Sequence, residues 1–139
     1  MRGRRIAFDY GDVRTGVALC DPDGILASPL TVLQSRDKDF LNHVVELITE
    51  HEAIHIYIGL PVHMSGTEGE SVEKVRAFSQ SLAERVNVPI SMVDERLSTV
   101  SAQRQLKDAG VSSRDSKGLI DAMAAVAILE QGLSRENLD

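Results

Sequence analysis

The sequence predicts an α/β fold with a mixed five-stranded sheet, three antiparallel hairpin-linked strands followed by two parallel strands, and helices on both faces. Two observations carry this prediction. Residues 5–33 contain three short apolar runs separated by turn residues, and the later apolar segments alternate between helical and strand periodicity. Tight turns join antiparallel strands, whereas helical crossovers join parallel ones, so this order implies one mixed sheet covered by helices.

The first three strands form a continuous hairpin unit. An apolar run over 6–8 ends at Asp9, a turn follows at Gly11 and Asp12, and a β-branched, small-residue strand covers 13–19. A turn at 22–24 leads to a third strand over 25–33. Because this strand contains Pro29, we expect it at the edge of the sheet or at a bulge.

The remaining segments alternate helix and strand. Apolar residues at helical spacing predict a helix over 40–48, with Ser35 or Asp37 as its N-cap, and a second helix over 72–86. Strands are expected over 54–60 and 88–93. Two further helices are predicted at 97–109 and 119–129, joined by a polar, mobile segment over 111–118.

Length and composition describe an ordinary globular protein. The chain has 139 residues, 42% hydrophobic and 26% charged, and we interpret 1–139 as one domain. No apolar stretch approaches the ~20 residues that span a bilayer. The N-terminal arginines resemble the start of a signal peptide, but Asp9, Asp12 and Arg14 interrupt the apolar segment that would have to follow. Cys20 is the only cysteine in the sequence. We expect it to be a core residue, and we expect the protein to be cytoplasmic.

The net charge of −6 argues weakly against non-specific nucleic-acid binding, which depends on Lys and Arg contacts to phosphate. It does not exclude a metal-dependent nuclease, because such an enzyme gathers carboxylates that divalent ions neutralise. The four histidines show no pattern typical of catalysis. No nucleophile elbow or Walker-type phosphate loop is present.

Acidic residues stand out at three places in the sequence. Asp9 ends an apolar strand and is either a turn residue or a metal ligand, and beside a glycine the turn is the more common role. Asp94 and Glu95 end the fifth strand, where their side chains point to opposite sides, and with Arg96 they would equally suit a solvated strand end. Asp121 lies in an apolar helix, either in a first turn stabilised by the helix dipole or as a carboxylate that needs a partner.

The predicted topology allows these acids to meet. The ends of the first, fourth and fifth strands lie side by side in such a sheet, which is where Asp9, Gly59 and Glu95 fall. Carboxylates without a His/Cys cluster favour Mg²⁺ or Mn²⁺ over Zn²⁺.

Four blocks of sequence resemble the YqgF/RuvX family. They are FDYGDVRTGVAL at 8–19, GLPVHMSGTEGESVEKVRAF at 59–78, VDERLST at 93–99 and KGLIDAMAAVAIL at 117–129, and together they span essentially the whole chain. Family members are described as Holliday junction resolvases and as nucleases that mature the 5′ end of pre-16S ribosomal RNA. The resemblance implies an RNase H-like fold and places the family's acidic triad on Asp9, Glu95 and Asp121, selecting Glu95 over Asp94.

The resemblance further implies a nuclease that uses Mg²⁺ or Mn²⁺ held by Asp9, Glu95 and Asp121. Its partners would be structured RNA, a ribosomal precursor or branched DNA, and it would act as a monomer or a homodimer. Basic residues near the motif acids could contact phosphate, or could be ordinary surface charges: Arg14, Arg96, Arg104, Lys107, Arg114 and Lys117.

Two alternatives stay open. One is a non-catalytic, nucleic-acid-binding ribosome-assembly factor whose acids are structural. The other follows from the DYG…TG motif, which also resembles the phosphate loop of sugar-kinase and actin-like ATPases. Those proteins bind nucleotide between two such domains, and 139 residues are enough for one.

Overall fold

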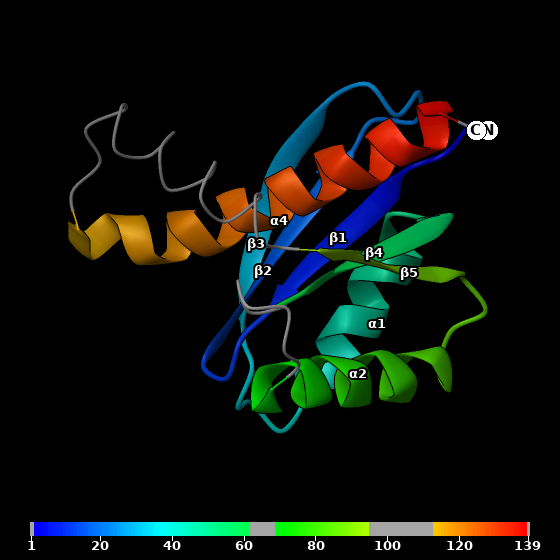
Figure 1. Ribbon diagram of the computed structural model, residues 1–139. Helices are drawn as coiled ribbons and strands as arrows, with labels where there is room; N and C mark the ends of the chain where they lie inside the picture. Colours follow the sequence, from blue (N-terminus) through cyan, green and yellow to red (C-terminus); the bar gives the residue numbers. More distant parts are fainter. Residues whose placement is uncertain (1, 62–68, 95–112, 139) are drawn as a thin grey trace.

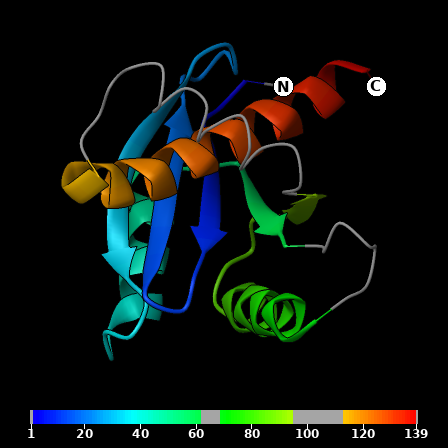
Figure 2. The same cartoon turned by 60° about the vertical axis from the view of Figure 1, so that its left-hand side comes forward.

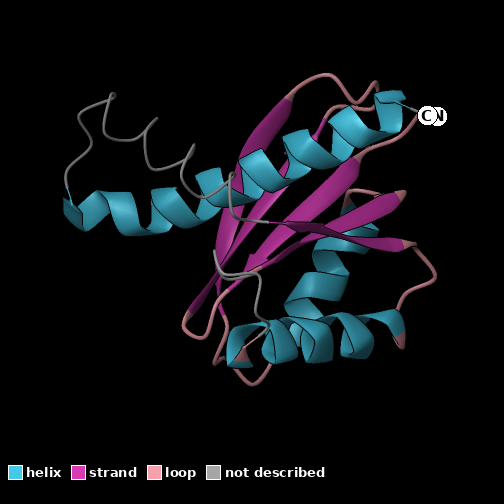
Figure 3. Cartoon of the chain, in the orientation of Figure 1, coloured by secondary structure: helices cyan, strands magenta, loops and turns pink. Residues whose placement is uncertain are grey.

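The computed structural model describes residues 2–61, 69–94 and 113–138, with side chains from 120 to 136 in the last range. Its elements confirm the predicted order of three strands, a helix, a strand, a helix and a strand (Figure 1; Figure 3). The elements are β1 (Arg5–Tyr10), β2 (Arg14–Cys20), β3 (Ala27–Gln34), α1 (Phe40–Glu50), β4 (His55–Leu60), α2 (Glu70–Ala83), β5 (Ile90–Asp94) and α4 (Ser113–Leu138). The helix predicted over 97–109 lies outside the described residues.

The five strands form one mixed sheet in the order β3-β2-β1-β4-β5. β1 pairs antiparallel with β2, and β2 with β3, whereas β1–β4 and β4–β5 are parallel. The predicted sheet is confirmed. So is the role of Pro29: β3 is an edge strand, and its register shifts where Ala18 pairs with Pro29.

Helices cover both faces of the sheet. α1 and α2 pack on one face, around a core that includes Ile6, Phe8 and Ile56. α4 crosses the other face, over Ala7, Ala18 and further small or apolar side chains (Figure 2). Alternate residues of β1 therefore serve different cores, as the two-residue period of a strand requires. The small residues on the α4 side let that helix approach the sheet closely.

Three local predictions were wrong. The third strand begins at Ala27 rather than at 25, and Ile25 and Leu26 are exposed. Asp39 precedes α1 as its N-cap, in place of Ser35 or Asp37, and its side chain makes no capping hydrogen bond. The segment expected to be a mobile connection up to 118 is helical from Ser113, so α4 has 26 residues.

Cys20 is a core residue, 2% exposed, as predicted. Within the described residues, no helix is both long enough and apolar enough to cross a membrane.

Candidate functional site

Asp9 is placed by the alternation of β1. Phe8 belongs to the core under α1 and α2, whereas Ala7 belongs to the core under α4. Asp9 lies two residues beyond Ala7, so its side chain projects from the α4 face of the sheet. It is half-buried, one residue before the end of the central strand.

Gly16 joins Asp9 to α4. In the β1–β2 ladder, Gly16 is the Cα partner of Asp9. A Cβ atom on Gly16 would lie 1.9 Å from the backbone oxygen of Asp121 and 2.9 Å from the backbone nitrogen of Ala122. The helix backbone thus rests directly on β2, an approach that only glycine permits. Asp9 and Asp121, 112 positions apart in the sequence, both adjoin this one residue.

Asp121 is paired with Arg14. The Nε of Arg14, at the start of β2, donates to Oδ2 of Asp121 at 2.8 Å. The side chains are 36% and 23% exposed, so the pair is partly withdrawn from water. The helix begins at Ser113, which places Asp121 two turns inside it, and the first-turn dipole interpretation was therefore wrong. The interpretation as a carboxylate that needs a partner is the one that the structure supports.

The acids at the end of β5 are only partly described. Ile90 and Met92 pack against the core under α1 and α2, whereas Val93 belongs to the core under α4. By this alternation Asp94 lies on the face opposite to Asp9. Glu95 and Arg96 lie outside the described residues.

The structure thus brings Asp9, Asp121 and Arg14 to one place, around Gly16. Arg114 and Lys117 fall in the first turns of α4, where side chains are not described. Asp12, which we interpreted as a turn residue, lies at the bend between β1 and β2, and its carboxylate accepts hydrogen bonds from Lys74 at 3.1 and 3.2 Å.

The donor set suits a hard divalent cation. Asp9 and Asp121 offer carboxylate oxygens, which Mg²⁺ and Mn²⁺ prefer. The guanidinium held by Asp121 shows that this position attracts positive charge. Among the described residues, no three acidic, histidine or cysteine side chains are grouped as a metal site, and the third predicted ligand, Glu95, is outside that set.

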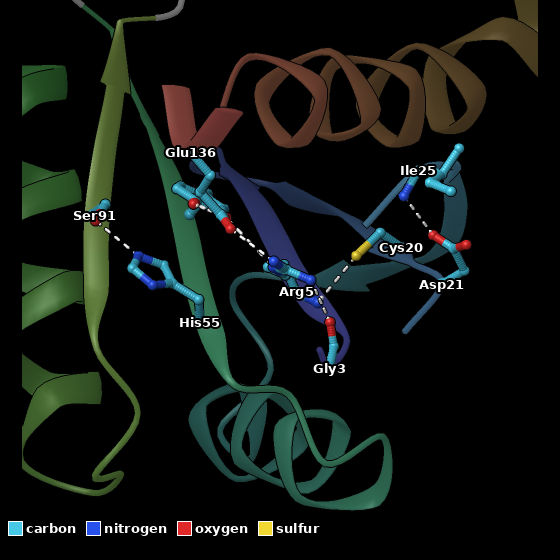
Figure 4. Close-up of polar contacts among 9 residues, drawn as sticks. Gly3, Arg5, Cys20, Asp21, Ile25, His55, Ser91 and Glu136 are labelled. Atoms are coloured by element: carbon cyan, nitrogen blue, oxygen red, sulfur yellow. Dashed lines mark hydrogen bonds and ion pairs between the residues drawn. The ribbon is translucent and has the colours of Figure 1, made fainter. Parts of the chain in front are cut away.

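A second polar cluster was not foreseen from the sequence. It lies where β1 begins, at the opposite end of that strand from Asp9 (Figure 4). Arg5, 4% exposed, pairs with Glu136 of α4 at 2.7 Å, and Tyr57 also donates to Glu136. His55 stacks on Tyr57 and shares a hydrogen bond of 2.8 Å with Ser91. Nothing local in the sequence could indicate a pair 131 residues apart.

Burial sets the titration of this second cluster. It lowers the pKa of His55, and it raises the pKa of Tyr57, as does the hydrogen bond to Glu136. Burial also opposes ionisation of Glu136, but hydrogen bonds from Arg5 and Tyr57 outweigh it and lower the pKa of that carboxyl. The cluster therefore holds an ionised Glu136 and a neutral His55 at pH 7.

A broad open groove between α2 and β5 lies away from the acids. Its volume is about 560 Å³, and it includes Arg76, Gln80, Asn87 and Met92 in its lining. It contains none of the predicted site residues. We therefore place the candidate site at Gly16 rather than in this groove.

Comparison with known sequences gives a consistent family. The RuvX model, described as Holliday junction resolvase, matches residues 3–135. A Streptomyces coelicolor protein named "Putative pre-16S rRNA nuclease" is 45% identical over 139 residues, covering 99% of this chain and 83% of the relative. A Mycobacterium leprae protein of the same name is 45% identical over 136 residues, covering 96% and 74%.

Solved structures agree on the fold. RuvC of T. thermophilus, in complex with a Holliday junction substrate, superposes with a TM-score of 0.62 at 11% identity over 96% of both chains. A second structure of Thermus thermophilus RuvC superposes with a TM-score of 0.57 at 13% identity. The fold is therefore RNase H-like, as the sequence motifs implied. With the family model and these relatives both spanning nearly its whole length, the chain belongs to the RuvX (YqgF) family.

Proposed function

We propose that this protein is a metal-dependent nuclease that hydrolyses phosphodiester bonds at the 5′ end of a pre-16S ribosomal RNA. The observation that carries the proposal is the meeting of Asp9 and Asp121 at Gly16, on the face of an RNase H-like sheet that α4 crosses. The names of relatives 45% identical to this chain support the RNA substrate.

We assign Asp9, Asp121 and Glu95 as the residues that hold Mg²⁺ or Mn²⁺. The first two supply oxygens from β1 and α4. Asp94 faces the other side of the sheet, which leaves Glu95 as the candidate for the third acid. When bound, such ions supply Lewis-acid polarisation of the phosphate and a water of lowered pKa.

The protein's own contribution is geometry and charge. The carboxylates stand on the central strand β1 and on α4, whose backbone contacts the neighbouring strand β2 at Gly16 without an intervening side chain, so we expect their spacing to be rigid. Arg14 is positioned to contact a substrate phosphate beside them. We assign the same role to Arg96, Arg114 and Lys117, from their positions next to the motif acids in the sequence.

Branched DNA is the second candidate substrate, because the matching family model is described as Holliday junction resolvase. A resolvase must cut two strands, and it therefore needs two active sites, which one copy of this chain does not provide. The oligomeric state in solution separates the candidates: a stable dimer favours the resolvase, whereas a monomer favours single cuts in RNA.

The test offers both substrates to one preparation. Wild-type protein is incubated with a 5′-extended pre-16S RNA and with a four-way DNA junction, in Mg²⁺, in Mn²⁺ or in EDTA. We expect metal-dependent cleavage of the RNA at defined positions. Asp9→Asn should lose at least about 100-fold in rate, since disturbing only the partners of metal ligands already costs about 10- to 100-fold.

The matched control is Asp12→Asn, which makes the same chemical change three residues away at an exposed acid paired with Lys74. It should cleave like wild type. Cleavage of the junction alone would assign the resolvase function. Binding without cleavage of either substrate in both metals would overturn the nuclease and leave an assembly factor.

A further inference from the structure

The ion pair between Arg14 and Asp121 is unusual for a site that is assigned to cations. It joins the start of β2 to the middle of α4, through one bond of 2.8 Å from Nε to Oδ2. The residues after Asp121 are largely buried: Ala122, Ala124 and Ala125 are between 0 and 5% exposed. The carboxylate therefore emerges from an apolar helix face and needs a compensating charge.

Arg14 supplies that charge without belonging to the helix. Its side chain is 36% exposed, so it can reach solvent and leave the carboxylate at little cost in packing. Asp121 cannot move in the same way, because its own backbone oxygen is pressed against Gly16. The arginine, which has the longer and more exposed side chain, is therefore the partner that we expect to move.

We propose that Arg14 is an exchangeable counter-ion of Asp121, which a divalent cation displaces from Oδ2 and which then binds the substrate phosphate. The inference rests on the metal site proposed above and adds a coupling to it. A cation that took Oδ2 would compete with the guanidinium for the same carboxylate oxygen, so metal binding and the 2.8 Å bond would oppose one another. Once released, the planar guanidinium suits a phosphate, which accepts two parallel hydrogen bonds from it.

The proposal has a counter-intuitive consequence. Removing Arg14 removes a competitor, so Arg14→Gln should bind metal more tightly while it binds RNA more weakly. If Arg14 instead oriented Asp121 as a ligand, the same substitution would weaken metal binding. The two roles therefore predict opposite signs for one measurement.

The measurement is calorimetric titration with Mn²⁺ alone, without nucleic acid. We expect Arg14→Gln to lower the dissociation constant about tenfold, within the usual range of coupling between sites. Arg14→Lys keeps the charge and should stay near wild type. Arg85→Gln removes an equal charge from an exposed side chain two residues beyond α2, and it corrects for the change in net charge.

Nuclear magnetic resonance of the Arg14 Nε–H group gives an independent readout. Bonded to Asp121, this proton should be protected from exchange with water, and saturating Mg²⁺ should shift its signal and abolish the protection. Circular dichroism of each variant checks that it is folded.

Two failures are distinguishable. Wild-type protein that binds Mn²⁺ no better than Asp9→Asn has no metal site at these acids, which overturns the proposed function together with this inference. Metal binding that depends on Asp9 but is unchanged or weaker in Arg14→Gln overturns the counter-ion role alone. A protected Nε–H signal that persists in Mg²⁺ does the same.

Discussion

Gly16 is the residue on which the geometry of the candidate site depends. Strand interiors disfavour glycine, which loses more conformational freedom on folding than other residues and offers no side chain to pack. Here the absence of a side chain is required, because the backbone of α4 occupies the place of a Cβ atom. A residue with no chemistry of its own thus sets the separation of two carboxylates.

We predict that Gly16→Ala destabilises the fold and weakens metal binding together. The new Cβ would lie 1.9 Å from the oxygen and 2.3 Å from the carbon of the Asp121 carbonyl, and neither backbone can move alone. We expect a loss of about 3 kcal/mol in the free energy of unfolding, at the upper end for overpacking. Urea unfolding and Mn²⁺ titration measure the two effects.

Gly132→Ala is the matched control for this change. It makes the same substitution at the other close contact of α4, where the obstacle is the Tyr57 ring at 2.6–2.8 Å. It should also destabilise, but it should retain the Mn²⁺ affinity of wild type, because it lies eleven positions from Asp121. Equal loss of metal binding in both variants would contradict a local role for Gly16.

At the scale of elements, two of the ion pairs among the described residues join α4 to the first hairpin. Arg14 binds the helix near the candidate site, and Arg5 binds it at Glu136, four helical turns away. Both arginines come from the first hairpin of the chain, and both acids from its last helix. Residues of the hairpin thus fix how far α4 can slide along the sheet, and with it the position of Asp121.

We predict that Glu136→Gln destabilises the protein by about 3 kcal/mol. Arg5 is 4% exposed, and it would keep its charge without a counter-charge. The value is at the low end for broken buried pairs, because the Glu136 side chain remains 26% exposed. The matched control is Asp23→Asn, which breaks the exposed Arg2–Asp23 pair and should change the free energy of unfolding by less than about 1 kcal/mol. Similar values for the two variants, from urea unfolding, would show that burial of Arg5 adds nothing.

Local sequence patterns predicted which helices and strands form more accurately than they predicted where each one begins and ends. The apolar periods of 6–8, 40–48 and 72–82 each recur as buried faces, and Pro29 correctly marked an edge strand. The start of α4 was missed because Ser113, Ser116 and Gly118 have low helix propensity and no apolar period. Tertiary contacts along the rest of the helix outweigh that preference.

For the site, the pattern selected the acids but not their relation. Asp9, alone, was more typical of a turn, and Asp121 was left between a first-turn position and a carboxylate that needs a partner. That partner, Arg14, and the shared neighbour, Gly16, are contacts between segments more than 100 positions apart, which no local period encodes. The placement of Glu95 remains a prediction.

At the scale of the whole molecule, the second polar cluster joins β1, β4, β5 and α4 through Arg5, Tyr57, His55, Ser91 and Glu136. At neutral pH its Glu136 is ionised and its His55 is neutral. These four elements include β1 and α4, which contain Asp9 and Asp121. We therefore expect titration of the cluster to change the free energy of unfolding of the entire fold.

We predict that the free energy of unfolding falls as the pH drops below 6.5. Burial lowers the pKa of His55 from 6.5 in the folded state, so between these values the unfolded chain binds more protons, and stability increases with pH. The contribution is complete above 6.5 and is lost as pH falls toward the folded-state pKa. Glu136, whose pKa is lowered from 4.5, adds a second loss of stability below that value.

Urea unfolding at pH values on either side of 6.5 measures how steeply the free energy of unfolding changes with pH. His55→Gln can still hydrogen-bond Ser91 but does not titrate, so it should flatten the slope, whereas His43→Gln, on α1 at the other face, should not. An unchanged slope in His55→Gln would show that the pH dependence of stability arises elsewhere in the molecule.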